Sequence, residues 1–221
     1  MFIRLSYDLR ENTPCPDGLW PVRIRHNHDI ELGKISNVFT VTLCNHVGTH
    51  IDGPRHFSRI KKALNEFPLE SFIFTHPVVL DLPKGDDALV HAEDLKKYRA
   101  IIETVDLLLI RTGFSAVRDM DPLRYTNHSP GFSAAAAQYV VNHLPNLRAL
   151  GMDTLSFAAP QQLAEGIKAH QILMDRTPRD IFLIEDVNLA ANLFGLKRVI
   201  VAPLFCEQID SAPCTILAYL E

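Results

Sequence analysis

The segment His46–His56, with the sequence HVGTHIDGPRH, constrains the fold of this chain more than any other. Gly48, Gly53 and Pro54 all disfavour a helix, because glycine costs backbone entropy in a helix and proline lacks a backbone donor. The apolar residues between the polar ones are β-branched, which favours extended backbone. We therefore predict an extended segment that bends where the glycine meets the proline.

Extended backbone gathers the polar side chains of this segment on one side. Side chains along a strand alternate with a period of two, so His46, His50 and Asp52 project together. Gly48 lies between the two imidazoles and has no side chain to separate them. His56 has the same parity, although the bend before it changes its direction. The pattern predicts a compact group of three imidazoles and one carboxylate.

Such a group predicts a divalent cation. Neutral imidazoles and a carboxylate suit Zn²⁺ and also accept Mn²⁺ or Fe²⁺. No cysteine lies in the segment, whereas structural zinc sites are closed and usually contain cysteines, so a catalytic site is favoured. The alternative is a loop of ordinary polar residues, which would crowd imidazoles and an acid together without an ion to offset their desolvation.

Composition excludes several classes of function. The chain has 221 residues, 47% hydrophobic and 22% charged, which is ordinary globular composition with enough length to bury a core. A formal net charge of -4, without long runs of either sign, argues against binding to nucleic acid or a membrane surface. The apolar runs are far shorter than the ~20 residues of a membrane helix, and no signal-peptide pattern follows Met1, so we expect a cytoplasmic protein.

The remainder of the chain predicts a mixed α/β fold in a single domain over residues 1–221, because strands and helices alternate in the second half and no linker or repeat is visible. Residues 10–21 contain three prolines and a glycine, which is typical of an irregular arm. Strands are expected over residues 1–9, 37–44, 77–82, 105–113, 147–152, 181–184, 199–204 and 215–220, and helices over 91–98, 133–143 and 164–174.

The pattern H-x-G-T-H-x-D-x-P-x-H resembles the motif of the metal-dependent cyclase family, which includes bacterial kynurenine formamidases and isatin hydrolases. Further similar stretches follow in the family's order over nearly the whole chain: LSYDL from Leu5, LIRTGF from Leu109, PGFS from Pro130 and LGMDTLS from Leu150. The resemblance implies an α/β fold of the swivelling β/β/α type with a mixed β-sheet. It also implies metal-dependent hydrolysis of a non-peptide C–N bond.

The resemblance further implies two Zn²⁺ ions per subunit, with Mn²⁺ as a possible replacement. The implied ligands are His46, His50, Asp52, His170 and Glu185. The first three would hold one ion, and Asp52 and Glu185 would bridge to a second ion that His170 also holds. His56 would be the catalytic acid and base. Apart from the resemblance, Glu185 follows the apolar run 181–184, where an acid is either exposed or directed at a cation.

Substrate and assembly follow from the same resemblance. It implies a small aryl formamide similar to N-formylkynurenine, with a cyclic amide or lactone as the alternative, and a homodimer or homotetramer. Trp20, the only tryptophan, is expected to bind substrate by stacking; its alternative is an anchor in the core or in a dimer interface. A non-catalytic binding protein stabilised by the metal is the alternative of a different class, and His56 argues against it. Nucleotide and serine-nucleophile motifs are absent.

Overall fold

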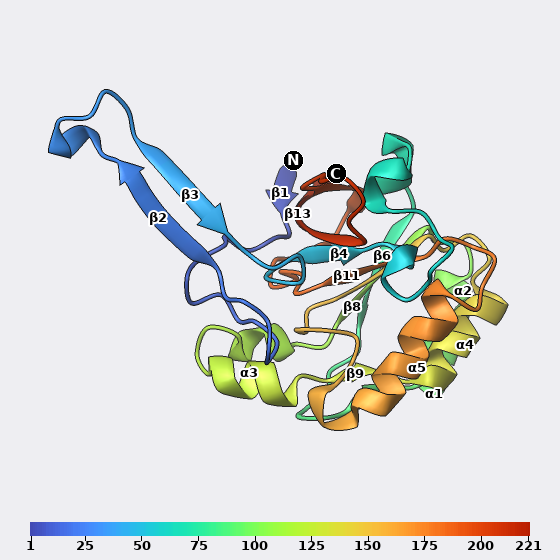
Figure 1. Cartoon of the computed structure of the whole chain (residues 1–221). Helices are drawn as coiled ribbons and strands as arrows, with labels where there is room; N and C mark the ends of the chain where they lie inside the picture. The colour runs from blue at the N-terminus through green and yellow to red at the C-terminus, as the bar shows by residue number, and fades with distance from the viewer.

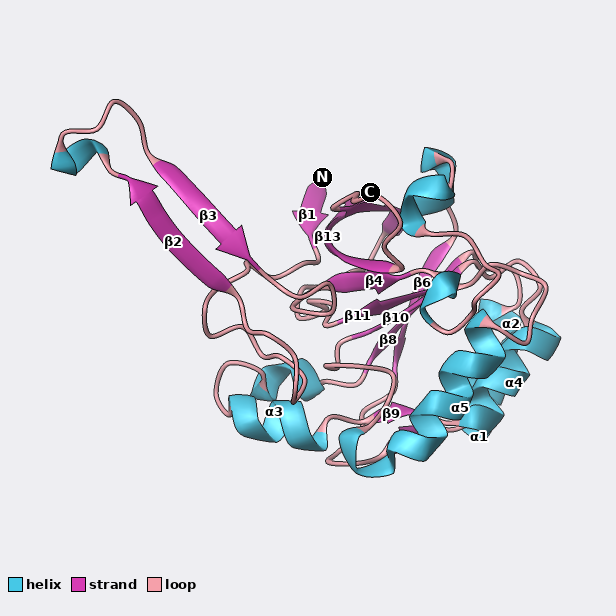
Figure 2. Cartoon of the chain, in the orientation of Figure 1, coloured by secondary structure: helices cyan, strands magenta, loops and turns pink.

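The computed structural model describes residues 1–221, and a nine-stranded mixed β-sheet forms its centre (Figures 1 and 2). In spatial order the strands are β5 (Ile73–Phe74), β12 (Leu196–Pro203), β13 (Ser211–Leu220), β4 (His50–Asp52), β11 (Phe182–Glu185), β10 (Ala149–Met152), β8 (Leu107–Arg111) and β6 (Pro77–Asp81), and β1 (Phe2–Arg4) pairs with β13. Neighbouring strands are parallel from β11 to β6, whereas β4 and the strands beyond it pair antiparallel. Strand β4 therefore joins a parallel half to an antiparallel half.

The parallel strands are apolar throughout because both of their faces are buried. In β8, Leu108 and Ile110 face one hydrophobic core, while Leu107 and Leu109 face a second core on the other side of the sheet. Strands β10 and β11 alternate in the same way. The antiparallel strands curl over the second core, and β12 also lies against β6, so the sheet is nearly closed.

The α-helices cover the first core, whereas strands, short 3-10 turns and loop residues enclose the second (Figure 2). The packed helices are α1 (Ala92–Lys96), α4 (Ala134–His143) and α5 (Leu163–Met174), with α2 (Arg99–Ile102) following α1 and α3 (Pro122–His128) lying apart near the irregular arm. The hydroxyl of Ser133 accepts a hydrogen bond from the Ala136 amide and so begins α4. A short parallel pair, β7 (Leu89–Val90) and β9 (Gly131–Phe132), lies outside the main sheet.

Two antiparallel strands, β2 (Arg23–His28) and β3 (Val38–Thr42), form a hairpin that projects far from the sheet (Figure 1). All residues of this β2–β3 hairpin, residues 23–42, are exposed except Asp29, which is half-buried. The apolar character of residues 37–44 predicted a strand, and one forms, but it does not enter a core. No helix of the chain is both long enough and apolar enough to cross a bilayer.

One prediction about the polar segment is wrong in part. Extended backbone is confined to β4, whereas residues 45–49 form a turn in which Gly48 has the left-handed φ of +64°. His56 ends a 3-10 turn, Pro54–His56, after the predicted bend. His46 therefore reaches the other ligands by a reversal of the chain, and strand parity does not place it.

Candidate metal centre

Strand register brings His50, Asp52 and Glu185 together. His50 of β4 pairs with Glu185 of β11, and the two side chains share one face of the sheet, with His50 Nε2 3.2 Å from Glu185 Oε2. Asp52, two residues along the same strand, faces the same side, and its Oδ1 lies 3.5 Å from His50 Nε2. All three side chains are buried. The junction of the two half-sheets is thus a cluster of acids and imidazoles.

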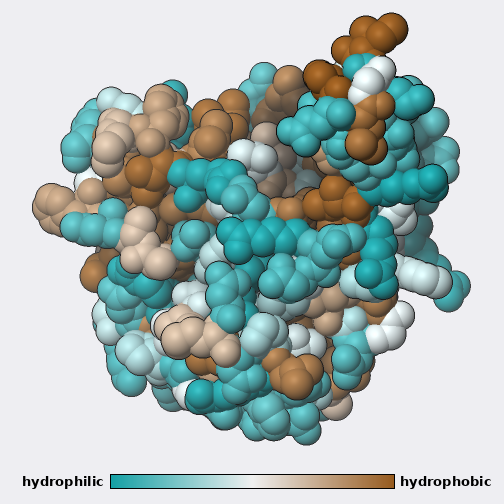
Figure 3. Space-filling model, turned by 90° about the vertical axis from the view of Figure 1, so that its left-hand side faces the viewer, coloured by the Kyte–Doolittle hydropathy of each residue, from teal (hydrophilic) through white to brown (hydrophobic).

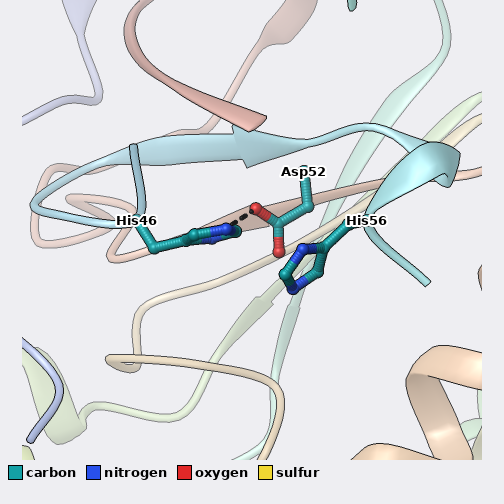
Figure 4. Close-up of side chains that lie close together, drawn as sticks. All are labelled: His46, Asp52 and His56. Atoms are coloured by element: carbon teal, nitrogen blue, oxygen red, sulfur yellow. Dashed lines mark ion pairs between the residues drawn. The ribbon is translucent and has the colours of Figure 1, made fainter. Parts of the chain in front are cut away.

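The turn before β4 adds His46 to this cluster. Its Nδ1 lies 3.1 Å from Asp52 Oδ1, and Figure 4 shows His46, Asp52 and His56 directed toward one another. The turn requires Gly48, because its positive φ is unfavourable for other residues and because a Cβ there would lie 2.7 Å from Cδ2 of Leu9. Gly48, which was expected in extended backbone between the two imidazoles, therefore lies in a turn that reverses the chain.

Two of the histidines have one ring nitrogen fixed by the backbone. Nδ1 of His50 lies 2.8 Å from the carbonyl oxygen of Gly48, and Nδ1 of His170 on α5 lies 2.8 Å from that of Gly166. Since a carbonyl only accepts, Nδ1 donates in both residues, and the lone pair of Nε2 points into the cluster. Nε2 of His170 lies 3.5 Å from Glu185 Oε1. This is the arrangement that a metal-binding imidazole needs.

Two buried atoms at the centre of the cluster, Nε2 of His50 and Oδ1 of Asp52, lie within ion-pair distance of their neighbours but have no partner in hydrogen-bond geometry. Leaving such a group unsatisfied costs about 1–3 kcal/mol. The possible ligand atoms form two groups that each lie within 4.8 Å, namely His46, Asp52 and His56, and His50, Asp52 and Glu185. Asp52 belongs to both groups. The residues present therefore fit a bound divalent cation.

The electrostatics of the cluster depend on pairing between opposite charges. Burial alone would lower the pKa of His46, but its ion-pair contacts with the Asp210 and Asp52 carboxylates raise it to about 11. Burial alone would raise the pKa of Glu185, but His170 and His50 hold it well below its usual range. Without a cation this pairing favours the protonated form of His46, and a cation that binds there must displace that proton.

Asp210 is a residue of the site that the sequence analysis did not identify. Its Oδ2 lies 2.6 Å from His56 Nδ1 and 3.7 Å from His46 Nε2, and these contacts lower its pKa. It precedes β13, whose first residue pairs with Asp52, and its carbonyl accepts from the Gly53 amide at 2.8 Å. A Cβ on Gly53 would lie 2.8 Å from that carbonyl oxygen, so only glycine permits this approach. Asp210 lies far from the histidine motif in the sequence, so neither spacing nor periodicity connects it with the site.

Neighbouring residues hold Glu185 in place. One carboxylate oxygen accepts from the Ser156 hydroxyl at 2.9 Å and from the Phe157 amide at 2.8 Å. The Phe157 ring also contacts His170 edge-on, with ring centroids 6.4 Å apart. Ser156 and Phe157, which follow β10, therefore fix the orientation of the Glu185 carboxylate.

A buried ion pair supports the residue that follows Glu185, and that residue contacts the segment before His50. Arg118 donates to both oxygens of Asp186 at 2.7 and 2.6 Å, and the Tyr125 hydroxyl donates to the same carboxylate at 2.7 Å. Asp186 follows Glu185 and has a φ of +52°, and its carbonyl accepts from the Thr49 hydroxyl at 2.6 Å. The Arg118 guanidinium stacks on the ring of Tyr7 at 3.9 Å. This network holds Thr49, the residue before His50, against Asp186, the residue after Glu185.

The cluster opens into a cavity of about 540 Å³. Five of the six residues predicted as metal ligands or catalytic group line this cavity, namely His46, Asp52, His56, His170 and Glu185. The sixth, His50, is buried behind them. Pro16, Asp17 and Leu19 of the irregular arm form part of its rim. Trp20 does not line the cavity and is 80% exposed, so its contact with substrate stays a prediction.

Comparisons with known proteins agree with this architecture. Residues 3–159 match the family described as "Putative cyclase". A Haemophilus influenzae protein described as uncharacterized is 36% identical over 114 residues, which are 52% of this chain and 80% of that protein. The kynurenine formamidase of Bordetella avium is 26% identical over 215 residues, which are 95% of this chain and 93% of the enzyme.

A similar fold has been solved in isatin hydrolase A from Ralstonia solanacearum. The TM-score is 0.86 at 20% identity, and the match covers 100% of this chain and 92% of that one. The α/β fold and mixed sheet expected from the sequence are confirmed. Because the family match spans well over half of its residues, the chain belongs to the cyclase family.

Proposed function

We propose that this protein is a metal-dependent hydrolase that cleaves the C–N bond of a small amide, with an aryl formamide similar to N-formylkynurenine as the first candidate substrate. The observation that carries the proposal is the buried cluster with two unsatisfied atoms, His50 Nε2 and Asp52 Oδ1, at the floor of a cavity. The similarity to a kynurenine formamidase over nearly the full length supports the choice of bond.

We assign the metal ligands as two sets joined by two acids. His46, His50 and Asp52 would hold one ion, and Asp52 and Glu185 would bridge to a second ion that His170 also holds. The nitrogen and oxygen donors favour Zn²⁺, with Mn²⁺ as the second choice. When bound, such ions supply a Lewis acid for the carbonyl and lower the pKa of water toward ~7.

His56 is the proposed acid and base. Its Nδ1 donates to Asp210, so the lone pair of Nε2 is available to accept a proton, and the negative charge of Asp210 stabilises the imidazolium that results. His56 is about one-quarter exposed and lines the cavity, so it can reach solvent and substrate. As water oxygen bonds to the carbonyl carbon and the C–N bond breaks, the same imidazolium returns its proton to the leaving nitrogen.

A cyclic amide or lactone is the second candidate substrate. No lysine or arginine lines the cavity, whereas N-formylkynurenine has a free carboxylate that such a residue would bind. The fold similarity to isatin hydrolase A supports the same alternative. A neutral ring that opens at a C–N or C–O bond needs only the groups that the cluster provides.

The test is hydrolysis by the purified protein, measured together with its metal content. N-formylkynurenine, formanilide, isatin and a lactone form the panel, and the variants are His56→Ala and, as a matched control, His128→Ala. His128 pairs with Asp87 and does not line the cavity. We expect the wild type and the control to hydrolyse at least one compound, and His56→Ala to lose at least about a hundredfold in kcat while it retains its metal.

Two outcomes would contradict the proposal. A protein that binds metal but hydrolyses no compound of the panel would be a binding protein stabilised by the ion. A His56→Ala variant that loses its metal would make His56 a ligand, which its distance to His46 and Asp52 permits geometrically.

A further inference from the structure

Several residues that line the cavity lie outside the metal cluster. The irregular arm contributes Asp17 and Leu19, α3 contributes Thr126 and Asn127, and the 3-10 turn Pro160–Gln162 contributes Gln161. These five residues form the outer wall of the cavity. A substrate whose reacting bond lies at the cluster extends along this wall, so its residues determine which chemical group the cavity accepts at the far end of the molecule.

A tight turn fixes the acid of the outer wall. The Leu19 amide donates to the Pro16 carbonyl at 3.2 Å, and Gly18 has the left-handed φ of +83° that the third position of such a turn requires. Asp17 occupies the second position and is exposed. No lysine or arginine lines the cavity beside it, so its negative charge is not neutralised there.

The other polar side chains of the outer wall use their donors within the chain. The amide nitrogen of Asn127 donates to the Leu123 carbonyl at 3.0 Å, and that of Gln161 donates to the Asn127 carbonyl at 3.1 Å. Since a carbonyl only accepts, these contacts fix which end of each amide is nitrogen and leave each amide oxygen free to accept. Thr126 donates its only hydroxyl proton to the Pro122 carbonyl at 2.7 Å. The outer wall therefore offers acceptors and one full negative charge.

The arginines of the segments around the outer wall are already paired. Arg124 of α3 donates to Asp86 at 2.7 Å, and Arg118 is buried against Asp186. Figure 3 views the molecule from the side on which α3 lies, and hydrophilic residues cover most of the lower half of that view. A charged group at the far end of a substrate would therefore meet a polar surface without an unpaired arginine.

We propose that the cavity selects amides whose far end carries an ammonium group, and that Asp17 is the residue that determines this preference. An ammonium has three donors and no acceptor, which matches a wall of acceptors, whereas a carboxylate would meet like charge. Leu19, Leu155 and Leu163 also line the cavity and suit the apolar body of such a molecule. The inference rests on the proposed function, because it concerns the far end of the same amide.

The experiment uses formanilides that differ only in the charge of their para substituent: aminomethyl, methyl and carboxymethyl. The wild type should have its highest kcat/KM for the ammonium compound and its lowest for the carboxylate. Asp17→Asn should reduce the ratio of these two values at least about fivefold, which is the upper range for one exposed charge pair. Most of the change should appear in KM, because Asp17 lies outside the cluster that acts on the bond.

Two matched variants and one change of solvent control for general effects of charge. Asp17→Glu retains the carboxylate and should keep most of the preference. Glu31→Gln removes the same charge from the exposed tip of the β2–β3 hairpin and should leave the ratio unchanged (Figure 1). Added salt should reduce the preference of the wild type, because an exposed pair is screened. Asp17 belongs to neither large core, so circular dichroism should show wild-type folding for its variants.

Binding without turnover separates this inference from the proposed function. The corresponding aryl ureas resist hydrolysis, and isothermal titration calorimetry gives their Kd values for the wild type and Asp17→Asn. Ureas that show the charge preference through Asp17, with formanilides that are not hydrolysed, would support the selection and contradict the proposed function. Formanilides that are hydrolysed with the same ratio by the wild type and Asp17→Asn would overturn the selection and leave the proposed function intact.

Discussion

Replacement of Arg118 by methionine tests whether its charge stabilises the buried carboxylate of Asp186, the residue that follows Glu185. In Arg118→Met, Asp186 would remain buried with only the Tyr125 hydroxyl and lose both guanidinium hydrogen bonds. Leaving one partner of a buried pair uncompensated costs about 3–5 kcal/mol. For a chain of this length each kcal/mol corresponds to roughly 2–4 °C in Tm, so we expect a fall of roughly 6–20 °C.

Acid should partly repair this variant, and the sign follows from the pKa of Asp186. Burial raises that pKa even though Arg118 and Tyr125 lower it, so loss of Arg118 raises it further. An acid with a raised pKa in the folded state costs stability while it is ionised, and the cost disappears as pH falls through that pKa. The difference in unfolding free energy between wild type and variant should therefore shrink as pH falls from neutrality.

Urea unfolding at several pH values measures both effects, and the double variant Arg118→Met, Asp186→Asn supplies the control. Because the second substitution removes the uncompensated charge, the double variant should be more stable than Arg118→Met by about 0.5–3 kcal/mol. A loss below about 1 kcal/mol in the single variant, with no change on acidification, would refute the view that Arg118 neutralises Asp186.

Three further results are expected. Gly48→Ala should destabilise the protein by at least about 1 kcal/mol in urea unfolding, because alanine disfavours positive φ and its Cβ would clash with Leu9; unchanged stability would mean that the turn can relax. Asp210→Asn should lower kcat by about 10–150-fold at unchanged metal content, from the loss of a charge-assisted bond worth about 1.5–3 kcal/mol, and equal kcat values would exclude a role for its charge. Chelation should lower Tm and Zn²⁺ at a hundred times its Kd should restore about 2.7 kcal/mol, whereas His50→Ala should not respond.

The sequence was sufficient to predict most of the sheet, because its central strands are continuous apolar runs of the kind that β8 shows. It was less informative about the elements that bury few apolar side chains in this chain. Strand β2, with the sequence RIRHNH, has only one apolar residue in six and was not predicted. Helix α3 was also missed, since its residues are mostly polar and only Tyr125 is buried.

For the site, a local motif and distant residues behave differently. His50 and Asp52 share a face because they lie two residues apart on β4, and His46 joins them through the short turn at Gly48. Asp210 and Arg118 have no such neighbours, and only the pairing of β4 with β13 and the fold of the chain around Asp186 bring them in. Residues that act through a partner far along the chain cannot be found from periodicity or spacing.

The position of β4 between two half-sheets also bears on when the cluster can form. Asp52 is synthesised early, yet its pairing partners are Leu183 and Ser211, near the end of the chain. A chain still emerging from the ribosome therefore has the HVGTHIDGPRH segment exposed long before it can be enclosed, and contacts so distant in sequence form slowly. Metal capture should then be a late event that completes folding, and a protein truncated before β13 should leave its histidines open to water.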